Sequence, residues 1–180
     1  MRIKNTFADN SPYSRSSNVY HGCKMTEILS AKDLENYIVY SFDDPKILKD
    51  ARTRRAFLNE NPSLDEECMD PLATLGDAVL DAVVVHWLYE KEKRTKGELT
   101  ECKNLQVKRK RTRAFAEQHK LNEYIQWGKG ELKQKNWMTG DKALDTVTEA
   151  LIGAVYLDAQ KRGMNGMKVV KDMLERMDFF

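Results

Sequence analysis

Two apolar stretches of the sequence carry carboxylates whose spacing could do chemistry. The first, residues 72–91 (LATLGDAVLDAVVVHWLYEK), holds Asp77 directly after a glycine, and the second, KALDTVTEALIGAVYLD, holds Asp145 and Glu149. Residues four apart project from one face of a helix, so Asp145 and Glu149 point the same way. If Asp77 faces that pair across the protein, the oxygens can share a hard divalent cation such as Mg²⁺. A water bound to that ion can be activated to attack a phosphodiester.

The spacing also leaves a structural interpretation open. Asp145 can begin a helix as a cap, Asp70 before Pro71 can do the same for the first stretch, and Glu149 can pair with a lysine or arginine. Asp70 lies two turns from Asp77 on the same expected helix, so it is also a candidate metal ligand.

Basic residues gather in one segment. The whole chain has a net charge of only +2, yet residues 91–135 contain 14 Lys or Arg against 6 Asp or Glu, a local excess of +8. Such a cluster neutralises phosphates without reading base sequence. The candidate RNA-binding residues are Lys103, Lys108, Arg109, Lys110, Arg111, Arg113, Lys129 and Lys133. The alternative is a solvated face balanced by the acidic loop 65–70 of the same or a neighbouring chain.

The elements that must position these residues are predicted to be helices, because no clear period-2 run argues for a sheet. We expect Asp33 to cap a helix that carries Leu34 and Ile38, and the Asp44–Pro45 turn to open the next. Further helices are expected from Asp70 to residue 91 and at 99–120, 121–127, 142–160 and 167–177, with loops at 59–70 and 128–141. The fold class is therefore an all-α bundle.

The chain is predicted to be one domain, residues 26–180, preceded by a polar flexible arm, residues 1–25. Three cysteines (Cys23, Cys68 and Cys102) without zinc-ligand spacing favour a reducing cytoplasm. The sequence shows neither a signal peptide nor a long apolar span, so no membrane partner is expected.

Five segments, in order, resemble the endonuclease domain of ribonuclease III over roughly residues 32–178. They are LENYIVYSFDDPKILKDARTRRAF, LATLGDAVLDAVVVHWLYEK, KGELTECKN, LNEYIQWGKGELK and TEALIGAVYLD. The resemblance implies an all-α homodimer that cuts double-stranded RNA with Mg²⁺. It assigns Asp77 and Glu149 to metal-binding positions, and Glu98 to an acidic position near the cleavage site. We expect no double-stranded-RNA-binding domain after residue 180, so the resemblance is expected to be to the short, single-domain members.

The sequence departs from the family's motifs at ligand positions. The signature Glu-Arg-Leu-Glu-Phe-Leu-Gly-Asp is here DPLATLGD, residues 70–77. Ala73 replaces a metal-binding glutamate, and Thr74 replaces the aromatic residue that helps to seal the dimer. In the later Asp-x-x-Glu motif Thr146 takes the aspartate position, while Asp145 lies one place earlier and remains on the Glu149 face.

Two main functions follow. The first is a Mg²⁺-dependent (or Mn²⁺-dependent) endoribonuclease for double-stranded or structured RNA, in which Asp77 and Glu149 are the principal ligands, Asp145 substitutes for the missing acid, and Asp70 and Glu98 are secondary. The second is a catalytically degenerate domain that binds structured RNA or a ribonucleoprotein as a scaffold. A helical protein-interaction module without RNA is a third possibility.

Overall fold

The computed structural model describes residues 28–91, 95–134 and 141–180. Within these ranges the chain is helical and contains no strand, only an isolated bridge between Thr53 and Gln126, so the predicted all-α bundle is confirmed. The arm predicted for residues 1–25 lies outside the described residues. In chain order the helices are α1 (Ala31–Ile38), α2 (Pro45–Ala51), α3 (Arg55–Glu60), α4 (Asp70–Lys91), α5 (Lys96–Gln106), α6 (Arg109–Gln118), the 3₁₀ helix η1 (Leu121–Tyr124), α7 (Lys129–Gln134), α9 (Asp141–Lys161) and α10 (Gly166–Arg176).

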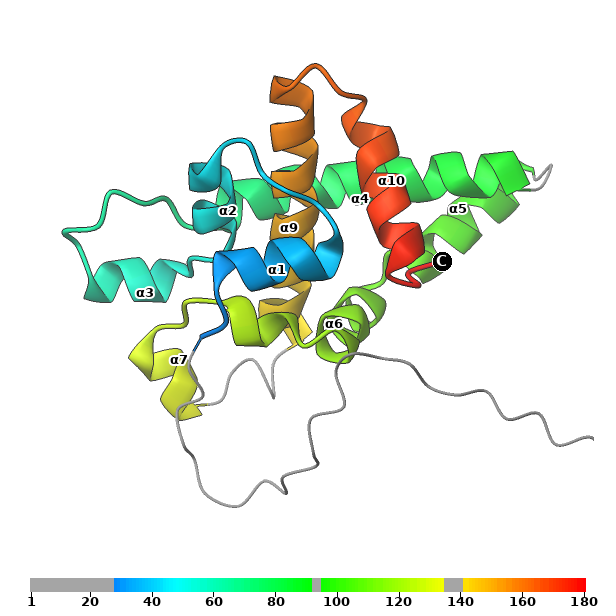
Figure 1. Ribbon diagram of the computed structural model, residues 1–180. Helices are drawn as coiled ribbons and strands as arrows, with labels where there is room; N and C mark the ends of the chain where they lie inside the picture. Colours follow the sequence, from blue (N-terminus) through cyan, green and yellow to red (C-terminus); the bar gives the residue numbers. More distant parts are fainter. Residues whose placement is uncertain (1–27, 92–94, 135–140) are drawn as a thin grey trace, which may run out of the picture.

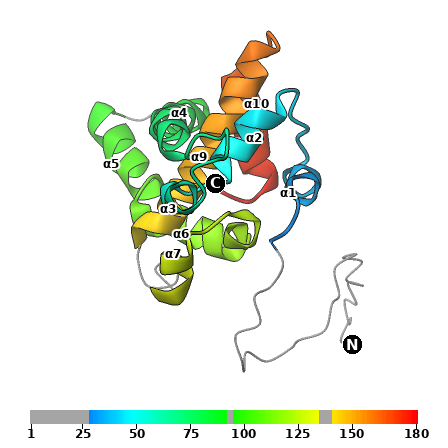
Figure 2. The same ribbon diagram turned by 90° about the vertical axis from the view of Figure 1, so that its left-hand side faces the viewer.

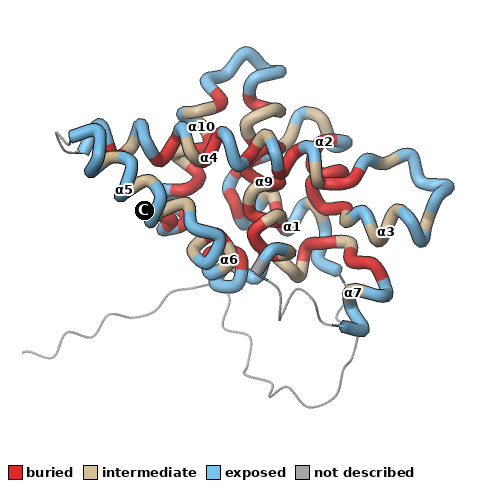
Figure 3. The backbone as a smooth tube through the Cα atoms, turned by 180° about the vertical axis from the view of Figure 1, so that it is seen from behind, coloured by how far each residue is buried: buried red, intermediate tan, exposed pale blue. Residues whose placement is uncertain are grey.

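Helix α9 runs through the middle of the molecule, and α4 crosses it (Figures 1 and 2). Its buried residues include Leu144, Ile152 and Val155, all less than 2% exposed, and α2, α6 and α10 pack around it. The buried part of the chain follows α9 and the middle of α4, whereas α3, α5 and α7 contain no buried residue (Figure 3).

Two glycines allow the α4 and α9 backbones to approach closely. A Cβ atom placed at Gly76 would clash with the Glu149 carbonyl group and would lie 2.8 Å from the Gly153 nitrogen. A Cβ atom at Gly153 would clash with the Leu72 carbonyl group and lie 3.0 Å from the Gly76 nitrogen. Gly76, which costs helix stability in isolation, is therefore required by the crossing.

A buried carboxylate ties the loop between α1 and α2 to α9. Asp158 is 0% exposed, and it accepts hydrogen bonds from the Tyr40 hydroxyl (2.6 Å) and from the backbone amides of Asp43 (3.1 Å) and Asp44 (3.0 Å). A buried carboxylate is stable only when its oxygens are bonded in this way. The contact fixes the start of α2, where Asp44 caps the helix as predicted.

Three predictions about the helices need correction. Ser30, not Asp33, caps α1, and Asp33 completes the capping box from the third helical position. The single helix predicted for 99–120 is two helices, α5 and α6, because the chain leaves helical geometry at Val107 and Lys108. This break lets α5 lie on α4 while α6 packs on α9.

The loop predicted for 128–141 contains α7. Its first amides are bonded by acidic side chains: Glu60 of α3 accepts from the Lys129 amide (3.0 Å), and Glu131 accepts from the Gly128 amide (3.2 Å). Because one of these partners lies on another helix, local sequence does not reveal the helix start. Residues 135–140 lie outside the described residues.

Helix α4 has the length and apolar composition of a candidate membrane span, contrary to the expectation that the sequence has no such segment. Eight of its residues are buried in this fold, among them Val79, Leu80 and Val84. Packing against α9 explains the apolar composition of these positions, because the core helix of a folded domain can be as long and as apolar as a helix that spans a membrane.

Substitution of Gly76 by alanine should destabilise the protein by about 3 kcal/mol, because the new methyl group meets backbone atoms that cannot rotate away. The matched control is Gly97→Ala on α5, where a Cβ atom would meet nothing within 4 Å. That change should leave the stability equal or raise it by up to about 1 kcal/mol, since alanine favours helix. Urea unfolding followed by far-UV circular dichroism measures both. Equal midpoints for the two variants would contradict the tight crossing.

Candidate functional site

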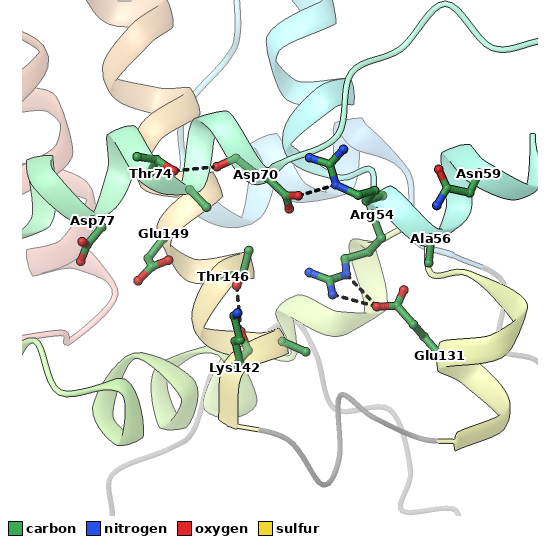
Figure 4. Close-up of a pocket in the computed structure, with 13 residues that line it drawn as sticks. Arg54, Ala56, Asn59, Asp70, Thr74, Asp77, Glu131, Lys142, Thr146 and Glu149 are labelled. Carbon is green, nitrogen blue, oxygen red and sulfur yellow. Dashed lines mark hydrogen bonds and ion pairs between the residues drawn. The ribbon is translucent and has the colours of Figure 1, made fainter. Parts of the chain in front are cut away.

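A cleft of ≈ 780 Å³ opens where α3, α4, α7 and α9 meet (Figure 4). Its walls combine acidic, basic and small side chains from four elements that are distant in the sequence. The lining residues are Arg54, Arg55, Ala56, Asn59, Asp70, Ala73, Thr74, Asp77, Glu131, Lys142, Ala143, Thr146 and Glu149.

The cleft brings Asp77 and Glu149 together, as the sequence predicted. Asp77 follows Gly76 on α4, and Gly76 is the residue whose missing side chain lets the Glu149 backbone approach. The two carboxylates consequently lie on adjacent turns of the two crossing helices and both face the cleft (Figure 4). Asp77 is exposed and Glu149 is half-buried.

Glu149 is half-buried and lies near two other carboxylates, those of Asp145 and Asp77. Burial, followed by the nearby charges of Asp145 and Asp77, raises the pKa of Glu149 from its ordinary value of 4.5 to about 7, although Arg109 acts in the opposite direction. In the described part of the chain Glu149 forms no recorded ion pair, so its predicted pairing with a lysine or arginine is not observed. A carboxylate in this environment gains stability from a bound proton or cation.

Asp145 does not join the pair in the cleft. Its buried carboxylate accepts hydrogen bonds from Arg109 Nε (3.0 Å) and from the Thr112 hydroxyl, both on α6. One residue is about 100° around a helix, so moving the acid from position 146 to 145 turns it from the cleft toward α6. Asp145 is also not a helix cap, since α9 begins at Asp141. Within the residues that the structure describes, no group of three His, Cys, Asp or Glu side chains is arranged to hold a metal.

The two acids predicted as secondary have different surroundings. Asp70 lines the cleft, but its carboxylate pairs with Arg55 Nε (2.8 Å) rather than capping α4 through backbone amides. Glu98 lies outside the cleft lining in the capping box of α5, where it accepts hydrogen bonds from the Thr95 amide (2.7 Å) and hydroxyl (2.8 Å). Glu98 therefore has a structural role at a helix start.

The residues at the two altered ligand positions both face the cleft. Ala73 has no donor atom, and the Thr146 hydroxyl donates to the Lys142 carbonyl oxygen (2.8 Å) on its own helix. The Thr74 hydroxyl likewise donates to the Asp70 carbonyl oxygen (3.1 Å). The positions are therefore in place, but neither Ala73 nor Thr146 offers a carboxylate oxygen to a cation.

Sequence reasoning missed the wall opposite these acids. Arg54 pairs with Glu131 of α7 (2.7 Å), and its guanidinium lies over the Trp127 ring at 5.4 Å. Asn59 of α3 also lines this wall, whereas Lys142 lines the cleft from α9, the helix that carries Glu149. No spacing rule joins residues of α3, α7 and α9, so only the folded chain reveals their proximity.

The basic segment is less uniform than predicted. Lys108, Arg109 and Lys110 are exposed at the junction of α5 and α6, and Lys129 and Lys133 are exposed on α7. Arg109 is exposed but pairs with Asp145 (3.0 Å). The other three predicted cations also have protein partners: Lys103 pairs with Asp81 (2.8 Å), Arg113 pairs with Glu117 (2.8 Å), and Arg111 donates to the Phe179 carbonyl oxygen.

In the described chain the ion pairs of the acidic loop 65–70 are made with residues outside the basic segment 91–135. Glu66 pairs with Lys49 of α2 (2.8 Å), and Asp70 pairs with Arg55 of α3. The alternative in which this loop of the same chain balances the segment is therefore not observed among the described residues, and charges at the α5–α6 junction face solvent.

Comparisons with known proteins agree with this architecture. A family model described as ribonuclease-III-like matches residues 44–176. Ribonuclease 3 of Syntrophobacter fumaroxidans is 35% identical over 126 residues, 69% of this chain and 52% of that protein. Ribonuclease 3 of Leuconostoc mesenteroides is 32% identical over 156 residues, 84% of this chain and 63% of that protein. The chain thus spans about half to under two thirds of these relatives.

A solved structure of the nuclease domain of ribonuclease III from Campylobacter jejuni superposes with a TM-score of 0.70 at 28% identity, covering 82% of this chain and 95% of that one. The all-α bundle is therefore the fold of a ribonuclease III nuclease domain. The chain belongs to the ribonuclease III family, and the predicted resemblance is confirmed.

The charge at Glu149 should make stability depend on pH. Its folded pKa of about 7 lies above the ordinary 4.5, so the stabilisation is fully present below about pH 4.5 and is lost as pH rises through about 7. Relative to Glu149→Gln, which mimics the protonated group, the wild type should lose on the order of 1–2 kcal/mol of unfolding free energy, after allowance for solvent screening. Urea titrations between pH 4 and 8 measure the difference.

A second variant tests the cause of that dependence. Asp77→Asn removes one of the neighbouring charges that raise the pKa of Glu149, so the midpoint of the pH-dependent loss should move to lower pH. Parallel stability curves for wild type and Glu149→Gln across the whole pH range would contradict the raised pKa of Glu149 in the folded protein.

Proposed function

We propose that the chain is a ribonuclease III-type endoribonuclease acting on double-stranded or structured RNA, with a reduced metal site formed by Asp77 and Glu149. The observation that carries this proposal is the placement of these two carboxylates side by side in an open cleft, without a recorded cation partner for either among the described residues. Like charges at close range, one of them half-buried, favour a bound cation.

The residues present fit one divalent ion. Mg²⁺ is commonly bound by one or two carboxylates together with waters and substrate phosphates, so Asp77 and Glu149 can hold it without a third acid. When bound, the ion supplies a Lewis acid and an activated water for phosphodiester hydrolysis. Ala73 and the back-bonded Thr146 offer no carboxylate for a second ion, so the donor set does not fit a larger cluster.

Other side chains of this chain prepare the cleft. The ion pairs Arg54–Glu131 and Arg55–Asp70 hold the α3 wall in place opposite the acids. Arg109 neutralises Asp145 next to the cleft, which limits the repulsion that Asp145 exerts on Glu149. Exposed Lys108 and Lys110 supply a cationic surface that can contact RNA phosphates in a salt-dependent manner.

A homodimer is part of the proposal. The description of the Campylobacter jejuni structure refers to a region involved in dimer formation in that protein. Here Thr74, at the position expected to seal the dimer, is exposed at the cleft. A second copy would place two such clefts on one duplex.

The second candidate function is a scaffold that binds structured RNA or a ribonucleoprotein without cutting it. The specific observation in its favour is Asp145, which the sequence offered as the replacement ligand but which is bonded to Arg109 and Thr112. Loss of side chains that bind the metal directly commonly costs orders of magnitude in rate, so RNA binding could persist where catalysis is lost.

Purified protein incubated with long double-stranded RNA and Mg²⁺ or Mn²⁺ should cut it in a metal-dependent way. Asp77→Asn and Glu149→Gln should each reduce the rate by at least about 100-fold, because each removes a charged ligand from a two-ligand site. Gel analysis of products measures the rates. Binding without cutting in the wild type would favour the scaffold, and absence of RNA binding even at low salt would contradict both functions.

Restoring a carboxylate should strengthen the metal site. Thr146→Asp places an acid in the cleft beside Glu149, and the affinity for Mn²⁺ measured by titration calorimetry should rise by about tenfold or more. Thr100→Asp on α5 is the matched control, because the Thr100 hydroxyl makes the same back-bond to the Lys96 carbonyl oxygen (2.9 Å) outside the cleft. Equal effects of the two substitutions would argue against a metal site between Asp77 and Glu149.

A further inference from the structure

Three cations line the cleft, and they differ in how their charge is used. Arg54 is paired with Glu131 at 2.7 Å, and Arg55 is paired with Asp70 at 2.8 Å. Lys142 is exposed and has no recorded ion pair with any residue in the described ranges 28–91, 95–134 and 141–180. The positive charge that acts on Glu149 comes from Arg109. Lys142 is therefore not an internal counter-ion of the acid pair.

The position of Lys142 is also unfavourable for the helix that carries it. It lies in the first turn of α9, a helix of 21 residues, where the helix dipole disfavours a positive side chain. Lysine is thus not explained by local helix stability. Its backbone is held by the Thr146 hydroxyl, which donates to the Lys142 carbonyl oxygen at 2.8 Å.

Charge balance in the cleft indicates what Lys142 could contact. Once the two ion pairs cancel, the charged lining side chains that remain are Asp77, Glu149 and Lys142. A divalent cation would neutralise the two acids. The single negative charge of an RNA phosphodiester would then be matched by the ammonium group of Lys142.

The helix geometry allows this arrangement. Lys142, Thr146 and Glu149 follow one another at i, i+4 and i+7 on the cleft face of α9. Lys142 and Glu149 are separated by about 10 Å along the helix axis, at 1.5 Å per residue. A lysine side chain and a phosphate group can fill that interval, over the short side chains of Thr146 and Ala73.

We propose that Lys142 is a phosphate-positioning residue, which binds the RNA backbone beside the Asp77–Glu149 pair and supplies the positive charge that a second metal ion would otherwise bring. The inference rests on the proposed function, because it places the RNA backbone in this cleft. It explains the joint appearance of Ala73, Thr146 and Lys142: two absent carboxylates leave no ligands for a second ion, and a fixed cation takes its electrostatic place.

The test separates RNA binding from metal binding and cutting. In an Asp77→Asn/Glu149→Gln background, without divalent ions, the affinity for a short RNA hairpin is measured across a salt series. Adding Lys142→Ala should lower the slope of log affinity against log salt by about 0.9, the value for one phosphate contact on a duplex. Lys142→Arg should keep the slope. Lys32→Ala, which removes an exposed lysine of α1 outside the cleft, is the matched control and should not change it.

The outcomes for Lys142 are distinguishable from those for the nuclease itself. An unchanged slope for Lys142→Ala, or equal loss with Lys142→Arg, overturns the phosphate contact whether or not the wild type cuts RNA. Failure of the wild type to bind Mn²⁺ or to cut, together with a reduced slope for Lys142→Ala alone, overturns the nuclease proposal and leaves the phosphate contact standing. In the wild-type background, Lys142→Ala should retain Mn²⁺ binding, because Lys142 is not a ligand.

Discussion

The close crossing of α4 and α9 is the constraint on which the rest of the structure depends. Gly76 and Gly153 each face a backbone group of the other helix, so neither position can carry a side chain. The crossing places the first two turns of α4 against the middle of α9, and it sets the positions of Asp77 and Glu149 in the cleft. Asp77 follows one of the glycines, and Glu149 contributes the carbonyl that the same glycine meets. The feature that builds the core therefore also builds the site.

Two acids four residues apart on α9 have different electrostatic surroundings. Asp145 is buried and satisfied by Arg109 and Thr112, so its charge is compensated within the protein. Glu149 lines the cleft beside Asp77, and burial together with the charges of Asp145 and Asp77 raises its pKa to about 7. One acid thus stabilises the packing of α6, while the other remains available to a ligand. Their different roles follow from a net rotation of about 40° around the helix, which directs Asp145 toward α6 and Glu149 toward the cleft.

Two ion pairs give the opposite wall of the cleft its shape without giving it a net charge. Arg54–Glu131 joins α3 to α7, and Arg55–Asp70 joins α3 to the start of α4. Because these pairs are partly exposed, their main effect is orientation rather than stability. They leave Lys142, on the same face of α9 as Glu149, as the lining cation that forms no ion pair within the described chain. A family member that lacks two carboxylates can in this way retain an electrostatically balanced cleft.

The sequence by itself determined the all-α class, most helix positions, and the pairing of Asp77 with Glu149, because apolar periodicity and local capping encode helices and the motifs of the ribonuclease III family keep their order and spacing. It did not determine the break between α5 and α6 at Val107, the contact of Glu60 with the first amide of α7, or the partner of Asp145. Each of these depends on contacts between helices far apart in the chain, which no local pattern specifies. The tertiary structure alone decided that Asp145 turns to Arg109, that four of the six predicted basic residues at 103–113 have protein partners, and that Lys142 faces the cleft. The physical reason is that a charged side chain pairs with whichever group the packing of the helices brings within its reach.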